Sequence, residues 1–232
     1  MIIHCAASKH DFGVALDEYY SNNEYGTEVV MNFAKEQNIK KIIYYSTVSA
    51  YGYEAVPCDE TGPLLPDNEY GKSKLAGEEQ LLSNNPQSIV LRTSWLYSEY
   101  GANFVKTMIR LGKERDELGV IYDQVGTPTY AGDLAETILH IIKTDIDSSI
   151  PFIAGIYHYS NEGVASWYDF TLAIHREKSI SCRIKPIESK EFPTPAPRPK
   201  YSVLNKGKIK KQYSVEIPYW LDSLKKCLSN MD

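Results

Sequence analysis

Four residues in the first third of the chain have the side-chain types and the spacing that proton transfer requires. Tyr70 and Lys74 are four residues apart, so on a helix both side chains project from one face and can reach one ligand. A free phenol has a pKa of about 10, and a neighbouring ammonium lowers that pKa because it favours the phenolate. Ser46 and Thr47 end an apolar run, at the expected carboxyl end of a strand, where doubly wound sheets bind ligands. Together they predict a proton relay for a carbonyl or an alcohol.

The spacing of Tyr70 and Lys74 is weak evidence by itself, because an exposed helix face carries such pairs by chance. Tyr70 lies 23 residues after Thr47 (70 − 47), and this order of strand end and helix favours the relay. Residues 71–73 match the end of a phosphate-binding P-loop, but Pro66 stands where that motif has its first glycine. We therefore predict no phosphate cradle at residues 71–73.

The histidines and cysteines predict no metal site. The five histidines are scattered without ligand spacing, and we expect His4 to be a packed residue at a strand end. The four cysteines lie 53, 124 and 45 residues apart, which is neither a metal-binding pair nor a disulfide framework. They are typical of reduced thiols in a cytoplasmic protein.

Short apolar runs alternate with amphipathic stretches along the chain. This is the pattern of βα units around a parallel sheet, and it predicts the strands and helices that position these residues. We expect Val29, Val30, Phe33 and Ala34 to line one face of the first helix, and residues 70–82 to form a solvated helix. Asp133 and Ser166 are the expected N-caps of two later helices. The expected strands are residues 2–5, 42–45, 89–91, 120–122, 156–159 and 182–187; the expected helices are residues 24–37, 70–82, 103–118, 133–142, 166–175 and 217–228.

These elements predict an α/β fold: a truncated, Rossmann-like, doubly wound parallel sheet with a small C-terminal substrate-binding lobe. We expect residues 1–119 to form a partial cofactor-binding domain and residues 120–232 to form the lobe, interleaved with the first part. A chain of 232 residues buries about 70–75% of its unfolded surface and needs no disulfide or metal to fold.

The charge and hydropathy of the chain exclude several classes of partner. The formal net charge is −5 and the pI is about 5.6, so a nucleic-acid partner is not expected, because phosphate binding needs a concentrated basic face. No apolar run approaches the roughly 20 residues of a membrane span, and residues 1–7 lack the features of a signal peptide. We expect a cytoplasmic protein with no membrane partner.

Motifs in the same order along almost the whole chain resemble the extended short-chain dehydrogenase/reductases, and among them the dTDP-4-dehydrorhamnose reductase family. The stretches at residues 92–95 and 126–129 resemble that family more specifically than the wider group. The matching motifs are residues 4–7 (HCAA), Asn23 with 26–27 (GT), 46–47 (ST), 70–78 (YGKSKLAGE), 92–95 (RTSW), 103–105 (NFV), 126–129 (GTPT), 133–135 (DLA), 165–168 (ASWY), 198–199 (RP) and Ser202.

The resemblance implies NAD(P)H-dependent reduction of a 4-keto group on a nucleotide-activated deoxysugar. In that case Tyr70 protonates the developing alkoxide, Lys74 holds the nicotinamide ribose, and Thr47 donates a hydrogen bond to the keto oxygen. Trp95 packs on the sugar, with core packing as the alternative, and Arg198 meets the diphosphate, with a solvated loop as the alternative. The cofactor is NADPH or NADH, and its implied contacts are Ala6, Ala7, Ser46, Tyr70, Lys74 and Thr93.

Two departures from the family pattern lead to further expectations. The family begins with a strand and a GxxGxxG phosphate loop, yet no two of the fourteen glycines here are three residues apart, so we expect the pyrophosphate site at a helix start to be absent. We then expect residues 2–5 to form an exposed sheet edge, through which the chain forms a homodimer. Val48 stands where the family usually has an aspartate, which leaves the polar substrate contacts there undetermined.

Two functions therefore remain open at the level of sequence. The first is a nucleotide-sugar 4-ketoreductase for dTDP-L-rhamnose or another polysaccharide precursor, inactive if the cofactor half is truly missing. The second is a non-catalytic nucleotide-sugar-binding or regulatory subunit with the reductase fold. The sequence does not determine the sugar, the choice between NADH and NADPH, or the oligomeric state.

Overall fold

The computed structural model describes residues 1–8, 15–52, 59–194 and 199–231. Four parallel strands form the main sheet in the order β1-β2-β3-β8. They are β1 (Ile2–His4), β2 (Ile42–Thr47), β3 (Ile89–Thr93) and β8 (Gly155–His158). Strand β3 is buried along its whole length, as the continuous apolar runs of a sheet covered on both faces require. The α/β class and the parallel sheet are thus as predicted.

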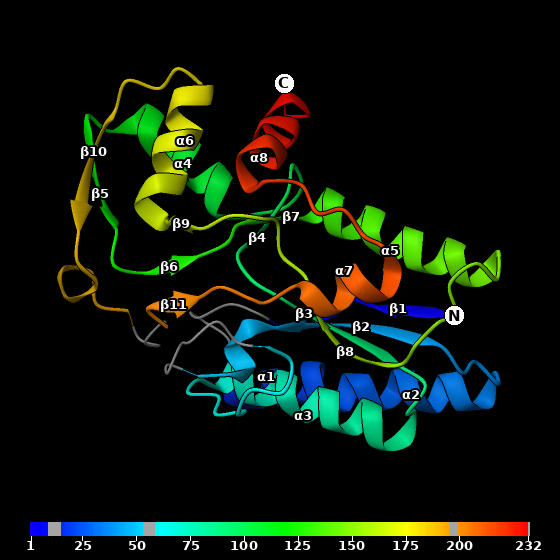
Figure 1. The fold of residues 1–232 in the computed structure, drawn as a ribbon. Helices are drawn as coiled ribbons and strands as arrows, with labels where there is room; N and C mark the ends of the chain where they lie inside the picture. The colour runs from blue at the N-terminus through cyan, green and yellow to red at the C-terminus, as the bar shows by residue number, and fades with distance from the viewer. Residues whose placement is uncertain (9–14, 53–58, 195–198, 232) are drawn as a thin grey trace.

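Helices cover both faces of this sheet, as Figure 1 shows. On one face lie α1 (Leu16–Tyr20), a π-helical turn (Ser21–Tyr25), α2 (Gly26–Glu36) and α3 (Glu69–Asn84). On the other face lie α5 (Ala131–Ile146) and α7 (Gly207–Tyr213). Alternate residues of the strands supply the two cores: Ile43 and Leu91 pack with α5 and α7, whereas Tyr44 packs with α2 and α3.

The remaining elements gather at one end of the sheet (Figure 1). Strands β5 and β10 pair in parallel, and α4 and α6 pack against them through Phe104, Met108 and Trp167. Helices α6 and α8 share a second apolar cluster centred on Phe170 and Leu224. The bounds are β4 (Leu96–Tyr97), α4 (Phe104–Glu114), β5 (Glu117–Ile121), β6 (Val125–Gly126), β7 (Thr129–Tyr130), β9 (Ala165–Ser166), α6 (Trp167–Glu177), β10 (Arg183–Ile187), β11 (Tyr201–Ser202) and α8 (Trp220–Ser229), with short 3-10 turns at Val48–Ala50 and Ser189–Glu191.

One of the two predicted N-caps is correct. Ser166 caps α6: its Oγ accepts from the Asp169 backbone N–H, and the Asp169 carboxylate accepts from the Ser166 N–H. Asp133 is not an N-cap, because α5 begins at Ala131. The Asp133 carboxylate is instead buried and accepts hydrogen bonds from Asn161 and Ser223.

The predicted helix over residues 103–118 is too long. Helix α4 ends at Glu114, and Leu118 already lies in β5. From residue 117 the pattern changes from helical to alternating, with Leu118 and Val120 buried and Glu117 exposed, which is the period of a half-buried strand. This change of period within one apolar stretch explains the error.

The predictions for the faces of two helices are wrong in part for α2 and wrong for α3. On α2, Val29 and Phe33 are 50% and 53% exposed, and the buried residues include Thr27 and Ala34. Helix α3 is not a solvated helix, because six of its residues are buried. Those residues are Gly71, Ser73, Lys74, Gly77, Glu78 and Leu81. Five of the six are small or polar, so apolar periodicity did not reveal this face. Among the described residues no helix is long and apolar enough to cross a membrane.

Candidate functional site

A cavity of about 690 Å³ lies at the carboxyl ends of β1, β2 and β3. In a parallel α/β sheet this end is where ligands bind. The first half of the chain supplies its polar floor, and the elements beyond residue 120 supply part of its wall. Its lining residues are Cys5, Ala7, Tyr45, Ser46, Thr47, Val48, Ser49, Asn68, Tyr70, Lys74, Thr93, Ser94, Trp95, Leu96, Ala102, Asn103, Phe104, Gln124, Trp167, Pro199 and Ser202.

The end of β2 places two hydroxyl groups at this cavity. Thr47 has extended backbone angles and caps the 3-10 turn Val48–Ala50, and its Oγ1 accepts a hydrogen bond of 3.1 Å from the Ser49 N–H. Both Ser46 and Thr47 are buried, at 4% and 7% exposed. The strand end thus holds both hydroxyls in fixed positions on the cavity floor.

The start of α3 brings in the phenol and the ammonium. Asn68 is the N-cap, and its Oδ1 accepts from the Gly71 N–H at 2.8 Å. Tyr70 is half-buried and Lys74, one turn later, is 2% exposed. Gly71 lets the helix approach the loop after β2, since a Cβ at this position would lie 2.5 Å from the Ser49 carbonyl oxygen. This close approach sets the distance between the two halves of the predicted relay.

The Lys74 ammonium is buried without a hydrogen-bonding or ion-pair partner among the residues that the structure describes. Its Nζ lies 3.9 Å from the centre of the Tyr44 ring, a favourable cation–π contact. Burial lowers the pKa of Lys74 to about 8. All three N–H donors therefore remain for a ligand in the cavity. This donor set fits the vicinal hydroxyls of a ribose.

An aromatic wall faces the polar floor. The Trp95 and Trp167 rings stack with centroids 3.5 Å apart and planes 8° apart, and Phe104 packs on Trp167. Trp95 has φ of +48°, a strained conformation for a bulky residue. Gly126 lies against the indole, because a Cβ there would come within 2.7 Å of it. Trp95 thus lines the cavity and is also packed against Trp167, and its contact with a sugar stays a prediction.

The structure brings most of the predicted site residues together. Ala7, Ser46, Thr47, Tyr70, Lys74, Thr93 and Trp95 all line the one cavity. Ala6 is exposed beside Ala7 and is not among the lining residues. Arg198 lies outside the described residues.

Sequence reasoning missed several residues of this region, among them Gln124 and Glu78. Gln124 is 5% exposed and lines the cavity; its Nε2 donates to Ser189 Oγ, and its Oε1 has no partner. Glu78 lies beneath the cavity, buried at 1% exposed. Glu78 lies four residues after Lys74, on the same helix face, and this spacing could have indicated that it belongs to the site.

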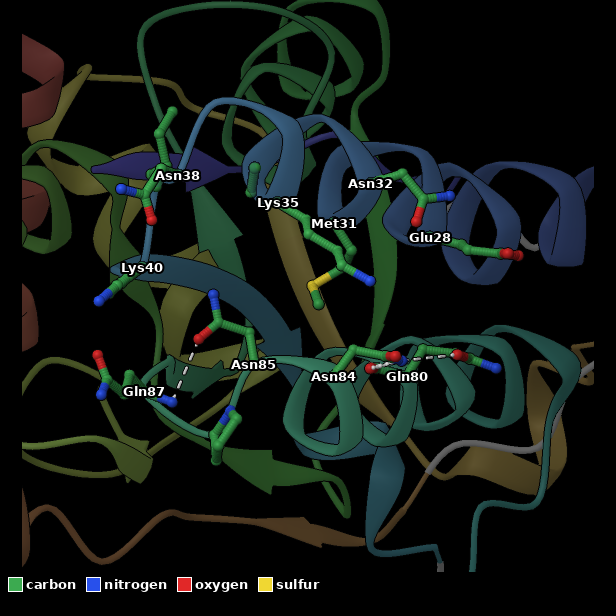
Figure 2. A pocket seen from close by; sticks show the side chains of 13 residues that line it. Glu28, Met31, Asn32, Lys35, Asn38, Lys40, Gln80, Asn84, Asn85 and Gln87 are labelled. Carbon is green, nitrogen blue, oxygen red and sulfur yellow. Dashed lines mark hydrogen bonds between the residues drawn. The ribbon is translucent and has the colours of Figure 1, made fainter.

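A second cavity, of about 510 Å³, lies between the carboxyl-terminal parts of α2 and α3 (Figure 2). Carboxamides dominate its lining, among them Asn32, Gln80 and Asn84. None of the predicted relay residues lines it. Among the described residues no group of three or more His, Cys, Asp or Glu side chains is placed to hold a metal.

Comparison with known proteins places the chain in a family. Residues 1–232 match the family described as RmlD substrate binding domain. The dTDP-4-dehydrorhamnose reductase of Aggregatibacter actinomycetemcomitans is 40% identical over 215 residues, which are 89% of this chain and 72% of the relative. The enzyme of the same name from Salmonella typhimurium is 38% identical over 197 residues, 82% of this chain and 65% of the relative.

A solved structure of dTDP-4-dehydrorhamnose reductase from Bacillus anthracis, in complex with NADP, superimposes with a TM-score of 0.90 and 35% sequence identity. The match covers 100% of this chain and 81% of that one. The relatives are therefore longer than this chain, which spans about two thirds of the Salmonella protein.

Proposed function

This chain belongs to the dTDP-4-dehydrorhamnose reductase family, and on that premise we propose that it carries the catalytic centre of an NAD(P)H-dependent 4-ketoreductase. The proposed substrate is the nucleotide sugar dTDP-4-dehydrorhamnose. One observation carries the proposal: a phenol, a buried ammonium and two strand-end hydroxyls line one cavity at the carboxyl ends of the sheet. Among these groups, the phenol, the ammonium and the Thr47 hydroxyl suit the protonation of an alkoxide as it develops.

The proposed roles follow from the chemistry of each group. Tyr70 donates its phenolic proton to the former keto oxygen, and Thr47 donates a hydrogen bond to the same oxygen. Lys74 stabilises the phenolate that remains, since its ammonium lies one helical turn away on the same face. NAD(P)H, when bound, supplies the hydride that reduces the keto carbon.

The residues at the cavity fit the nicotinamide-ribose half of that cofactor. The buried, unpartnered Lys74 ammonium supplies donors to ribose hydroxyls, and Ser46 and Thr93 lie on the same floor. We propose Ala6 and Ala7 as backbone contacts at the end of β1. No residue of this chain is assigned to the pyrophosphate, and either NADPH or NADH is compatible with these contacts.

On the substrate side we propose Trp95 against the sugar and Arg198 against the diphosphate. Gln124, Trp167 and Ser202 come from the part of the chain beyond residue 120 and line the same cavity. They support a division into a cofactor-binding part at residues 1–119 and a substrate-binding lobe at residues 120–232. We also propose a cytoplasmic location and a homodimer through the β1 edge.

The experiment is to measure reduction of dTDP-4-dehydrorhamnose by the purified chain through consumption of NADPH. Replacing Tyr70 by Phe removes the acid and keeps the ring, so kcat should fall by about 10²–10⁴-fold while the affinity for NADPH stays the same. Tyr25→Phe is the matched control, because that phenol is 61% exposed and does not line the cavity.

Two results would contradict the proposal. A Tyr70→Phe variant that loses less than about tenfold in kcat has another proton donor. A wild-type chain that binds the nucleotide sugar but consumes no NADPH would instead favour the non-catalytic binding or regulatory subunit.

A further inference from the structure

Glu78 is a buried carboxylate directly behind the proposed catalytic residues. It lies four residues after Lys74 and eight after Tyr70 on α3, so the three side chains follow one face of the helix. Its carboxylate pairs with Arg92 of β3: Nη2 lies 2.6 Å from Oε2, and Nε lies 3.0 and 3.2 Å from the two oxygens. Arg92 is fully buried and Glu78 is 1% exposed. The pair is thus enclosed and bidentate.

The other donors around this pair hold it in one geometry. Arg92 Nη1 donates to the Tyr51 hydroxyl at 2.6 Å. That hydroxyl lies 2.6 Å from His158 Nε2, and His158 Nδ1 lies 3.1 Å from the Asn205 carbonyl oxygen. The network runs from α3 across β3 and β8 to the segment before α7. A carboxylate held this way has little freedom to turn.

Glu78 determines what Ser46 can offer a ligand. The Ser46 hydroxyl donates to Glu78 Oε1, and an ionised carboxylate only accepts hydrogen bonds. The single proton of Ser46 is therefore committed away from the cavity that Ser46 lines. A ligand atom that reaches the Ser46 oxygen must therefore be an N–H or O–H donor.

Glu78 is also the source of negative charge near Lys74. The other titratable groups around the ammonium are neutral at pH 7: burial lowers the pKa of His4 to about 4, and it raises the pKa of Cys5 and of Tyr44. Tyr70 on the same helix is a phenol. The Glu78 charge favours the protonated Lys74 and so opposes the effect of burial.

We infer that Glu78 is a positioning residue of this site. Through Ser46 it fixes the direction of one hydrogen bond to the ligand, and its charge favours the protonated form of Lys74 one turn earlier on the same helix face. The inference rests on the proposed reductase function for the identity of the ligand, but not for the arrangement of the residues.

The test uses two variants of the full chain. Glu78→Gln keeps the shape of the side chain and removes its charge, but it leaves Arg92 unpaired in the interior, which is strongly destabilising. The double variant Glu78→Gln with Arg92→Met has neither charge, and replacement of a buried ion pair by uncharged residues of similar size is often tolerated. The double variant is therefore the one to assay.

In the double variant the alkaline limb of the kcat profile should move to lower pH, because the Glu78 charge that raises the pKa of Lys74 is gone; the loss of the Arg92 charge acts in the opposite direction and limits the size of this shift. A merely structural role predicts reduced stability with the wild-type pH profile, and that result would overturn the inference. Ser46→Ala should weaken NADPH binding without moving the profile, because it removes the acceptor and keeps the charge.

A second measurement does not require turnover. The unfolded chain keeps the Lys74 proton up to about pH 10.5, whereas the folded chain releases it near 8, so the free energy of unfolding rises with pH between these values. The wild-type chain and the double variant are each compared with the same protein carrying Lys74→Met. The difference in the free energy of unfolding within each pair isolates the contribution of Lys74. In the double variant the rise should begin at lower pH.

These two readouts separate the possible failures. A wild-type chain without reductase activity whose double variant still shows the stability shift would contradict the proposed function alone. A chain with activity whose double variant shows neither shift would contradict the role of Glu78 alone.

Discussion

Lys74 places an ammonium group where water cannot solvate it, and the folded chain loses stability as a result. Burial lowers its pKa from 10.5 to about 8. A pKa change of one corresponds to a free-energy difference of about 1.4 kcal/mol between the two protonation states. The chain accepts this cost at the position where the proposed function needs a cation. Such a conflict between stability and local chemistry is typical of a functional site.

Replacing Lys74 by Met should therefore stabilise the fold while it abolishes ligand binding by the ammonium. The expected gain in the free energy of unfolding at pH 7 is up to about 3 kcal/mol, and it should disappear as the pH rises through 8 toward 10.5. Urea denaturation at several pH values measures it. Lys72→Met is the control, because Lys72 is an exposed helix residue paired with Glu69, and a gain there would contradict the explanation by burial.

Sequence spacing predicted two kinds of site residue: those whose partners are close in the chain, and those that stand at the end of a strand. Tyr70 and Lys74 follow from helical periodicity, and Thr47 follows from the end of an apolar run. Trp167 stacks on Trp95 although 72 residues separate them (167 − 95), so no local pattern indicates the contact. Glu78 was missed because a buried polar face has no apolar period, although its spacing from Lys74 on the same helix could have indicated it.

At the scale of the element, the first turn of α3 decides where the proposed acid stands. Gly71 follows Tyr70 directly, and a Cβ there would lie 2.5 Å from the Ser49 carbonyl oxygen and 3.1 Å from Pro66. The Ser49 carbonyl belongs to the backbone, so it cannot move aside as the end of a flexible side chain could. A side chain at position 71 must therefore move the start of α3 away from the strand end that holds Thr47.

We expect Gly71→Ala to destabilise the chain by about 1–3 kcal/mol, as overpacking does, and to lower kcat by displacing Tyr70. Thermal unfolding and the reductase assay measure the two effects. Gly26→Ala is the matched control: position 26 is helical, and its Cβ would make only an ordinary contact of 3.5 Å, so the change should stabilise by about 0.4–1 kcal/mol. Equal effects at the two glycines would contradict the steric explanation.

The elements that sequence analysis predicted are the longer helices and the apolar strands of the main sheet. The short helices α1 and α7, and the two-residue strands around the cavity, were not predicted, because so few residues carry no period. Residues 126–129 run from the end of β6 to the start of β7, and β6 pairs with β9 and β11. These pairings join distant segments, and only the folded chain brings them together.

At the scale of the whole molecule, the alternation of strands and helices was enough to predict a parallel sheet with helices on both faces. It was not enough to predict the strand order. Strand β8 begins after residue 150, yet it pairs with β3 in the main sheet, next to elements that come much earlier in the chain. Helix α5 packs on residues of β2, β3 and β8, which are far apart in sequence, so no local pattern indicates this order.

The same sheet has an edge that bears on association. Among the described residues β1 pairs only with β2, so its other side presents backbone N–H and C=O groups without strand partners. Such an edge is a template for pairing with another chain. Ile3, in the middle of β1, is 44% exposed, and this adds an apolar surface beside the unpaired backbone.

We therefore expect the wild-type chain to self-associate with rising concentration, and Ile3→Lys to reduce this, because a charge on an edge strand repels a second copy. The half-exposed position lets the lysine reach water, so little stability should be lost. Light scattering over a concentration series measures the association. Leu139→Lys, a similar change at a 61% exposed position on α5, should leave it unchanged. A wild-type chain that stays monomeric at high concentration would contradict association through β1, and equal effects of both lysines would assign the association to general surface hydrophobicity.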